Sequence, residues 1–298
     1  MDHPVSAAAA APARHAPRII AHRGASTEAP EHTYAAYVAA LEAGADGLEC
    51  DVRLTADGHL VCVHDRKVDR TSNGTGVVSA LELASLEELD FGSWHESVAK
   101  RDMANAETAA RTAADEEEPD RDDRGANRVL TLRRLLDLAA AQPRRVELAI
   151  EVKHPSRYAG QVERSLVSVL DEYGWAPRKA GADSPARIMS FSSSAVRRAN
   201  RLAPGVGTVF LMEPFVYRAR GGALPCGVRI AGPSIEILRT RPESVERWHR
   251  AGVEVHVWTV DEPGDLELCV SLGVDAVITN RPRAMRAALS AFASSPAE

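Results

Sequence analysis

Acidic side chains occur two positions apart in one apolar run of the chain and recur in a second run. Glu49 and Asp51 lie in GLECDV, and Glu151 lies in AIEVK, two positions before Lys153. Residues two apart in a strand share one face, so each pair projects to the same side. Carboxylates in apolar strands are costly to bury unpaired. Ion pairs with Lys153 or an arginine would satisfy them. Three carboxylates grouped at strand ends would instead form a site for a hard cation.

Two histidines close apolar runs, and each has a charged neighbour. His22 ends RIIAH before Arg23, and His64 ends LVCVH before Asp65. A general base and a general acid with pKa values near neutral require this kind of pair. The residues therefore predict acid–base chemistry beside the cation.

The elements that must position these residues alternate along the chain. Short β-branched runs predict strands at 19–22, 47–52, 148–152, 188–191, 207–212, 228–231, 253–260 and 276–279. Helical patterns lie between them at 32–43, 130–141, 161–173, 193–202, 243–251, 264–272 and 282–293. Eight alternating strands favour a (β/α)8 TIM-like barrel, whose strand C-termini form the active face. No Gly-x-Gly-x-x-Gly follows the first strand, which weakens a dinucleotide-binding alternative.

One further strand interrupts the alternation. Ala56-Asp57-Gly58 separates two apolar alternating runs, 48–55 and 59–64. Asp-Gly in this position is a strong hairpin signal. A turn centred between Asp57 and Gly58 predicts that Asp51 pairs with His64.

Composition excludes several classes of protein. The chain has 298 residues and a net charge of 36 − 42 = −6, which argues against a nucleic-acid binder. No run approaches the roughly 20 apolar residues of a membrane span.

Residues 1–17 lack a secretory signal and are expected to be a disordered lead of a cytoplasmic protein. A charge of −5 lies in residues 101–124, so we expect a flexible acidic insertion at about 98–127, and residues 18–298 form the barrel domain.

Taken together, these motifs resemble the glycerophosphodiester phosphodiesterase family. The matching segments, in order, are AHRG at 21–24, APEHT at 29–33, GADGLECDVRLTADGHLVCVHD at 44–65, RTSNGTG at 70–76, LTLRRLLDL at 130–138, AIEVKHP at 149–155, MSFS at 189–192, VHVWTV at 255–260 and GVDAVITNRP at 273–282. The resemblance spans nearly the whole chain.

The resemblance implies a TIM-like barrel with one divalent cation, Mg²⁺ or Ca²⁺. The family hydrolyses glycerophosphodiesters such as glycerophosphocholine or glycerophosphoethanolamine to sn-glycerol 3-phosphate and an alcohol. Carried over by motif, the site residues are Glu49, Asp51 and Glu151 for the metal, His22 and His64 for acid–base catalysis, and Arg23 and Lys153 for the phosphate. Attack by water and attack by the glycerol 2-hydroxyl through a cyclic phosphate both stay open.

Three further residues are candidates for the substrate pocket. Glu31 could touch the glycerol, cap a helix that begins near His32, or pair with Arg23. Phe191 and Trp258 end strands and could wall the glycerol pocket, while core packing is an equal alternative for Phe191.

The chain departs from the family pattern in two places. His32 replaces the asparagine usual in the Pro-Glu-Asn-Thr motif, and the acidic insertion lies where a shorter loop or small subdomain is usual. Two alternatives to a glycerophosphodiester phosphodiesterase are therefore kept: a lysophospholipase D-type enzyme, or a non-catalytic binding barrel. Either enzyme would have a small-molecule substrate as its partner, and the oligomeric state is left open.

Overall fold

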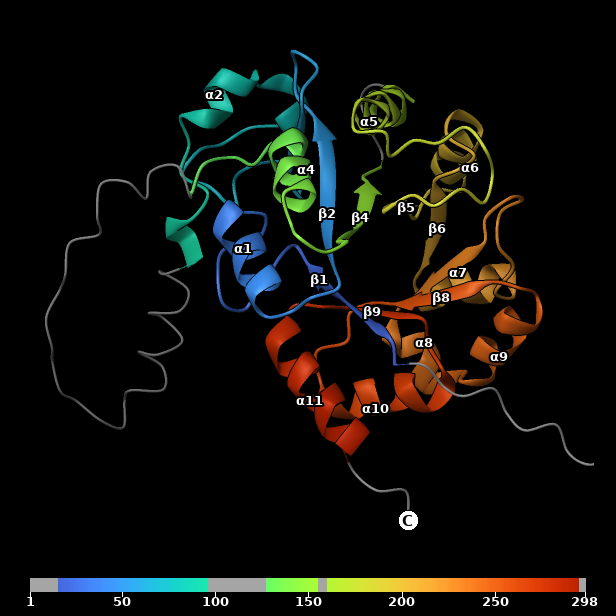
Figure 1. The fold of residues 1–298 in the computed structure, drawn as a ribbon. Helices are drawn as coiled ribbons and strands as arrows, with labels where there is room; N and C mark the ends of the chain where they lie inside the picture. The colour runs from blue at the N-terminus through green and yellow to red at the C-terminus, as the bar shows by residue number, and fades with distance from the viewer. Residues whose placement is uncertain (1–15, 96–126, 155–159, 295–298) are drawn as a thin grey trace, which may run out of the picture.

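The fold is a closed barrel of parallel strands wrapped by helices, as the computed structural model shows for residues 16–95, 127–154 and 160–294 (Figure 1). The parallel strands are β1 (Arg18–His22), β2 (Gly47–Leu54), β4 (Glu147–Val152), β5 (Ala186–Ser190), β6 (Gly207–Met212), β7 (Ile230–Pro233), β8 (Glu254–Val257) and β9 (Ala276–Thr279). β1 pairs with both β2 and β9, which closes the circle. The predicted TIM-like barrel is confirmed.

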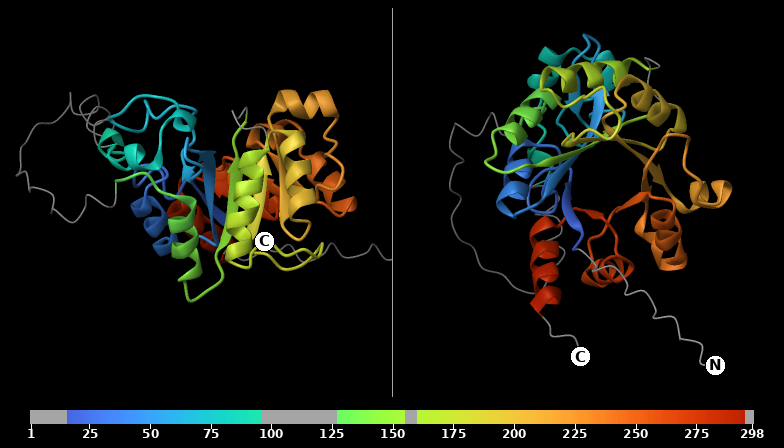
Figure 2. Two further views of the ribbon diagram at one scale, coloured as in Figure 1. Left: turned by 90° about the horizontal axis from the view of Figure 1, so that it is seen from above. Right: turned by 45° about the vertical axis from the view of Figure 1, so that its right-hand side comes forward.

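Helices form the outer ring, which is visible in the right-hand view of Figure 2. They are α1 (Tyr34–Glu42), α2 (Leu83–Glu87), α4 (Leu132–Ala140), α5 (Gln161–Glu172), α6 (Ser193–Leu202), α7 (Pro214–Arg220), α8 (Ile235–Thr240), α9 (Glu243–Arg250), α10 (Pro263–Leu272) and α11 (Pro282–Ser294), with a 3₁₀ turn at Val78–Ala80. Thr33, Thr131 and Ser192 cap α1, α4 and α6, because each side-chain oxygen accepts a backbone N–H of the first turn.

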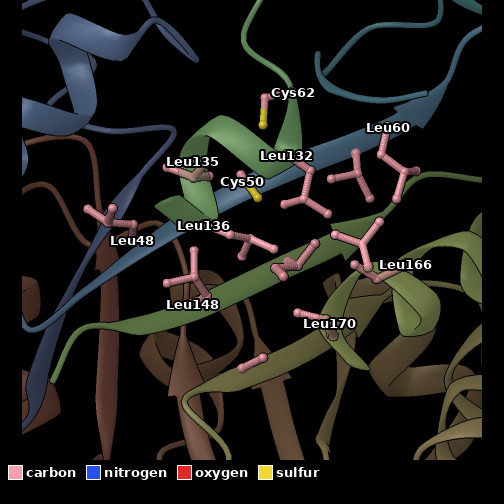
Figure 3. Close-up of a cluster of buried hydrophobic side chains, with 14 of the residues drawn as sticks. Leu48, Cys50, Leu60, Cys62, Leu132, Leu135, Leu136, Leu148, Leu166 and Leu170 are labelled. Atoms are coloured by element: carbon pink, nitrogen blue, oxygen red, sulfur yellow. The ribbon is translucent and has the colours of Figure 1, made fainter. Parts of the chain in front are cut away.

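Alternation along each strand decides which side chains face the barrel interior. In β2, Leu48 and Cys50 pack outward against the leucines of α4 (Figure 3). The intervening Glu49 and Asp51 therefore face inward, as the period of two requires. The lower interior is filled by apolar side chains, namely Ile20, Ala149, Met189, Val209, Leu211, Ile230, Ala276 and Ile278. Inward positions beyond this apolar layer, towards the strand C-termini, are the ones available for chemistry.

The predicted hairpin exists, but its predicted register is wrong by one residue. β2 pairs antiparallel with β3 (Leu60–Cys62), with Val52 opposite Cys62, and Val63 N–H donates to Asp51 O. The loop has three residues, because Thr55 N–H donates to His59 O over 2.9 Å and Gly58 adopts a φ of 89°. Val63, not His64, therefore stands opposite Asp51.

Several predicted boundaries also shift. β7 begins at Ile230 instead of Val228, β8 ends at Val257, and α1 begins at Tyr34 after its Thr33 cap. The helices α2, α7 and α8 were not predicted, because they are five to seven residues long and give little periodicity. The predicted lead (apart from residues 16 and 17) and nearly all of the acidic insertion lie outside the described residues. Within the described part of the chain, no helix has the length and apolar character needed to cross a membrane.

Candidate active site

A cavity of about 230 Å³ opens at the C-terminal ends of the barrel strands. Its lining includes eight of the ten predicted site residues, namely His22, Arg23, Glu49, His64, Glu151, Lys153, Phe191 and Trp258. Asp51 lies just beneath this lining and is fully buried, while Glu31 does not line the cavity and pairs with Arg23, which does. The location agrees with the rule that barrel enzymes place their active sites at this face.

The three predicted metal ligands come together. Glu49, Asp51 and Glu151 are buried, and one carboxylate oxygen from each lies within 4.8 Å of the others. Lys153 Nζ lies 2.9 Å from both Asp51 Oδ1 and Glu151 Oε2. The ion pair between Glu151 and Lys153 that the sequence suggested is therefore present, but it belongs to a larger cluster.

The three carboxylates of this cluster outnumber the positively charged side chains beside them. Burial and the neighbouring Asp51 raise the pKa of Glu151 to about 7 and raise that of Glu49 well above its usual range. Burial also opposes ionisation of Asp51, but the hydrogen bond from His32 and the charge of Lys153 hold its pKa well below the usual range. With all three carboxylates ionised, Arg23 and Lys153 would leave a net charge of −1 at the cluster.

This donor set fits a divalent cation. Asp51 Oδ1 is buried and accepts no hydrogen bond of good geometry, although Lys153 Nζ is close as an ion pair. Carboxylate oxygens are the ligands that Mg²⁺ and Ca²⁺ prefer. A divalent cation would change the local charge from −1 to +1, which a phosphodiester monoanion would bring to zero. Glu49, Asp51 and Glu151 would hold the cation.

Arg23 is fixed tightly at the end of β1. Its φ of 58° is left-handed, which is uncommon for a residue other than glycine and is found at functional sites. Its backbone N–H donates to Glu49 Oε2 over 3.0 Å, and its guanidinium lies against Glu31 at 3.2 Å and Asp51 at 3.1 Å. These contacts fix the orientation of the Arg23 guanidinium at the cavity wall.

The orientation of His22 is set by a residue on the opposite end of the chain. His22 Nδ1 lies 2.7 Å from Asn280 Oδ1, and Asn280 Nδ2 donates to Asp261 Oδ2 over 2.6 Å. A carboxylate only accepts, so the amide nitrogen faces Asp261 and the amide oxygen faces His22. His22 therefore carries its proton on Nδ1 and leaves Nε2 free. Burial, with a contribution from Arg23, lowers the pKa of His22 to about 4.

His64 has a charged partner instead of an amide. Its Nδ1 lies 2.7 Å from Asp65 Oδ1, so it donates to that carboxylate and Nε2 is again left over. Arg70 Nε donates to Asp65 Oδ2, and its other nitrogens donate to both oxygens of Glu31. Burial lowers the pKa of His64. Through Arg70 and Glu31, the His64 side of the cavity is linked to Arg23.

The other half of the cavity is apolar and aromatic. Phe191 and Trp258 meet edge to face with their ring centroids 5.3 Å apart, and Trp258 Nε1 donates to Gly232 O. Met189, Leu211 and Ile278 complete this wall. Glu213 also lines the cavity, is exposed, and follows β6, which lies across the barrel from β1.

Two residues at the site were not predicted to belong to it, and the alternation could have identified them. Asn280 lies two positions beyond the inward-facing Ile278. Glu213 lies two positions beyond the inward-facing Leu211. Continuing the inward period past each strand would have placed both at the cavity. For Glu31, the pairing with Arg23 is the alternative that the structure shows, and Thr33 is the helix cap.

Comparison with known proteins agrees with this geometry. Residues 22–284 match the model of the glycerophosphoryl diester phosphodiesterase family. A protein of Mycobacterium tuberculosis named probable glycerophosphodiester phosphodiesterase 1 is 42% identical over 89% of this chain and 90% of its own length. A glycerophosphodiester phosphodiesterase of Caldanaerobacter subterraneus is 31% identical over 90% of this chain and 95% of its own length.

Solved structures share the fold. An Oleispira antarctica phosphodiesterase, solved in complex with the product sn-glycerol-3-phosphate, has a TM-score of 0.72 at 24% identity and covers 92% of this chain and 97% of its own. A glycerophosphodiester phosphodiesterase from Agrobacterium tumefaciens has a TM-score of 0.67 at 26% identity, covering 91% and 99%. The non-catalytic alternative is thereby set aside, and the chain belongs to the glycerophosphoryl diester phosphodiesterase family of hydrolases.

Proposed function

We propose that the chain hydrolyses small glycerophosphodiesters, such as glycerophosphocholine or glycerophosphoethanolamine, to sn-glycerol 3-phosphate and an alcohol, in a reaction that needs Mg²⁺ or Ca²⁺. One observation carries the proposal: a single cavity joins a buried three-carboxylate cluster, two cationic side chains, and two histidines whose Nδ1 atoms are both committed. We further propose that the enzyme acts in the cytoplasm on soluble substrates.

His22 is the general base in this proposal. Its Nδ1 proton is held by a neutral amide, so Nε2 is free to accept a proton from the nucleophile, which is either water or the glycerol 2-hydroxyl; in the second case water then opens the cyclic phosphate. The lowered pKa of His22, about 4, keeps this nitrogen unprotonated at neutral pH. Nε2 lies 3.9 Å from Glu49 Oε2, which places the base beside the carboxylate cluster.

His64 is the general acid. Asp65 is ionised, because its hydrogen bonds from Arg70 and His64 outweigh partial burial and hold its pKa at about 2. A carboxylate partner stabilises an imidazolium better than the amide partner of His22 does. His64 is therefore the histidine of the pair suited to carry a proton on Nε2 and deliver it to the oxygen of the departing alcohol.

Charge at the phosphate is handled by the remaining groups. The Arg23 guanidinium and the Lys153 ammonium line the cavity and would hold the non-bridging oxygens as negative charge develops. A divalent cation held by Glu49, Asp51 and Glu151 supplies Lewis-acid polarisation of a phosphoryl oxygen when bound. Glu31 orients Arg23 from behind and does not line the cavity.

The apolar half of the cavity supports a substrate with short carbon chains on both sides of its phosphate. Phe191 and Trp258 wall the carbon-bound portion of the substrate. Glu213 adds a negative charge on the rim, across the cavity from Arg23. This charge favours a substrate whose alcohol portion is positively charged. Choline and ethanolamine have that charge.

Product identification tests the proposal. Purified protein is incubated with glycerophosphocholine and Mg²⁺ or Ca²⁺, and the products are followed by ³¹P NMR. We expect sn-glycerol 3-phosphate and no phosphocholine. Absence of any phosphorus product with either cation, or an unchanged rate in His22→Ala, would overturn the proposal. Lysophosphatidylcholine assayed in parallel distinguishes the lysophospholipase D alternative, which predicts that this substrate is preferred.

A further inference from the structure

His32, which the resemblance identified as replacing an asparagine usual in the family, lies against the carboxylate cluster. It is only 6% exposed, and its φ of 61° is left-handed, a conformation that asparagine and histidine tolerate better than most residues. Its backbone N–H donates to Arg23 O over 3.0 Å. The main chain therefore fixes the histidine between the end of β1 and the start of α1.

Both ring nitrogens of His32 have partners in the interior. Nε2 lies 2.9 Å from Asp51 Oδ2, and Nδ1 lies 2.8 Å from the hydroxyl of Tyr37, which is fully buried. Because an ionised carboxylate only accepts, Nε2 must carry the proton of the first contact. The Tyr37 hydroxyl has one proton: it donates that proton to Nδ1 when His32 is neutral, and to the Glu49 carbonyl when Nδ1 carries a proton of its own.

Tyr37 links the same histidine to a second member of the cluster. Its hydroxyl lies 3.1 Å from the backbone carbonyl of Glu49. One His–Tyr unit therefore contacts β2 at two points, through the Asp51 side chain and the Glu49 main chain. Asp51 Oδ2 is thereby occupied, and Oδ1, which has no hydrogen bond, faces Lys153 and Glu151.

From this arrangement we propose that His32 is a positioning residue for the divalent-cation site: it fixes the rotation of the Asp51 carboxylate so that Oδ1 is presented to the cation. The inference rests on the cation dependence of the proposed function. Hydrogen-bond partners behind metal ligands commonly change metal affinity by about 10–100-fold when they are removed. His32 does not line the cavity, and the side-chain contact that it makes with the proposed cation ligands is the one to Asp51, so we expect its effect to pass through Asp51.

The test measures cation binding without turnover. Mn²⁺ is titrated into wild type and variants, and the free ion is followed by electron paramagnetic resonance. We expect His32→Ala to raise the dissociation constant by about 10–100-fold. His32→Gln, whose amide nitrogen reaches close to the Nε2 position, is expected to recover most of that loss. His32→Asn, whose amide nitrogen reaches only the Nδ1 position, is expected to recover little.

A matched control separates positioning from general stability. His256 is also buried, at 2% exposure, and its Nε2 lies 3.2 Å from Glu254 Oε2 at the other end of the barrel. His256→Ala should lower the melting temperature while leaving the Mn²⁺ dissociation constant unchanged. If His32→Ala, folded by circular dichroism, binds Mn²⁺ as tightly as wild type, the inference is wrong. If wild type itself binds no Mn²⁺, Mg²⁺ or Ca²⁺, the cation dependence in the proposed function fails first.

Discussion

His22 Nδ1 lies 2.7 Å from Asn280 Oδ1, although 258 positions separate the two residues in the chain. Barrel closure makes the contact possible, because β1 pairs directly with β9. Asp261 completes the arrangement by fixing both the backbone and the amide of Asn280. A residue that directly follows the last strand thus determines which ring nitrogen of His22 is left free at the cavity.

Removing the contact between His22 and Asn280 should impair catalysis more than folding. In Asn280→Ala, His22 loses the acceptor that holds its tautomer, so we expect kcat to fall by about 10–100-fold, less than the roughly 10²–10⁴-fold loss of a missing acid–base group. Steady-state kinetics on glycerophosphocholine measures this. Asn200→Ala, which removes a contact to Gly227 away from the cavity, is the control and should keep the wild-type kcat. Equal kcat values in both variants would show that Asn280 has no such role.

The two histidines should respond differently to the leaving group. A glycerophosphodiester of p-nitrophenol releases an anion that needs no proton. His64→Ala should therefore lose about 10²–10⁴-fold on glycerophosphocholine but much less on the p-nitrophenyl substrate. His22→Ala should lose activity on both. The opposite pattern would exchange the acid and base assignments.

Cation binding should strengthen as pH rises through neutrality. Burial and Asp51 raise the pKa of Glu151 to about 7, so below that pH a proton competes with the cation. The stability that the protonated carboxyl gives the cation-free protein is present at low pH and is lost as pH rises through 7. The increase in melting temperature on adding Mg²⁺ should therefore be larger at pH 8 than at pH 6.

Thermal unfolding with Mg²⁺ and with EDTA at each pH provides the measurement. Glu151→Gln is the control, because it removes the titrating group and should reduce the dependence of the Mg²⁺ increment on pH. An increment in wild type that is larger at pH 6 than at pH 8 would contradict the charge deficit inferred for the carboxylate cluster.

Glu213 should influence the choice of alcohol. Glu213→Gln removes the rim charge, so kcat/KM for glycerophosphocholine should fall by up to about 5-fold, the range of an exposed ion pair. The fall for glycerophosphoglycerol, whose alcohol is neutral, should be smaller. Glu172→Gln, at the far end of α5, is the control and should leave the ratio of the two kcat/KM values unchanged. An equal fall for both substrates in Glu213→Gln would assign the side chain to the shared glycerol portion.

Much of the fold followed from patterns that tertiary packing does not override. The β-branched runs predicted the barrel strands. The two-residue period alone placed Glu49 and Asp51 on one face of their strand, and it likewise placed Glu151 and Lys153 on one face of theirs. The hairpin register failed because a dipeptide signal does not reveal whether the loop has two or three residues. Only the Thr55 and His59 pairing settles that.

The site residues that belong to sequence motifs could be predicted. The contacts that form only because the barrel closes could not. His22, His64, Glu49 and Glu151 line one cavity, and Asp51 lies directly beneath them, although His64 is not the residue opposite Asp51 in the hairpin. The supporting contacts come from distant segments. Asn280, which follows β9, contacts His22; Arg70, in the loop after the hairpin, contacts Asp65; and Tyr37, in α1, contacts His32. Local sequence contains no signal for such contacts, except the inward alternation that continues from Ile278 to Asn280.

Depletion and restoration of the cation tests the central claim most directly. The protein is stripped with EDTA, dialysed, and assayed for release of sn-glycerol 3-phosphate from glycerophosphocholine while Mg²⁺ or Ca²⁺ is titrated back. The account predicts that the stripped protein is inactive, that either or both cations restore the release, and that Asp51→Asn is not restored. Full activity in the stripped protein, or equal restoration in Asp51→Asn, would contradict it.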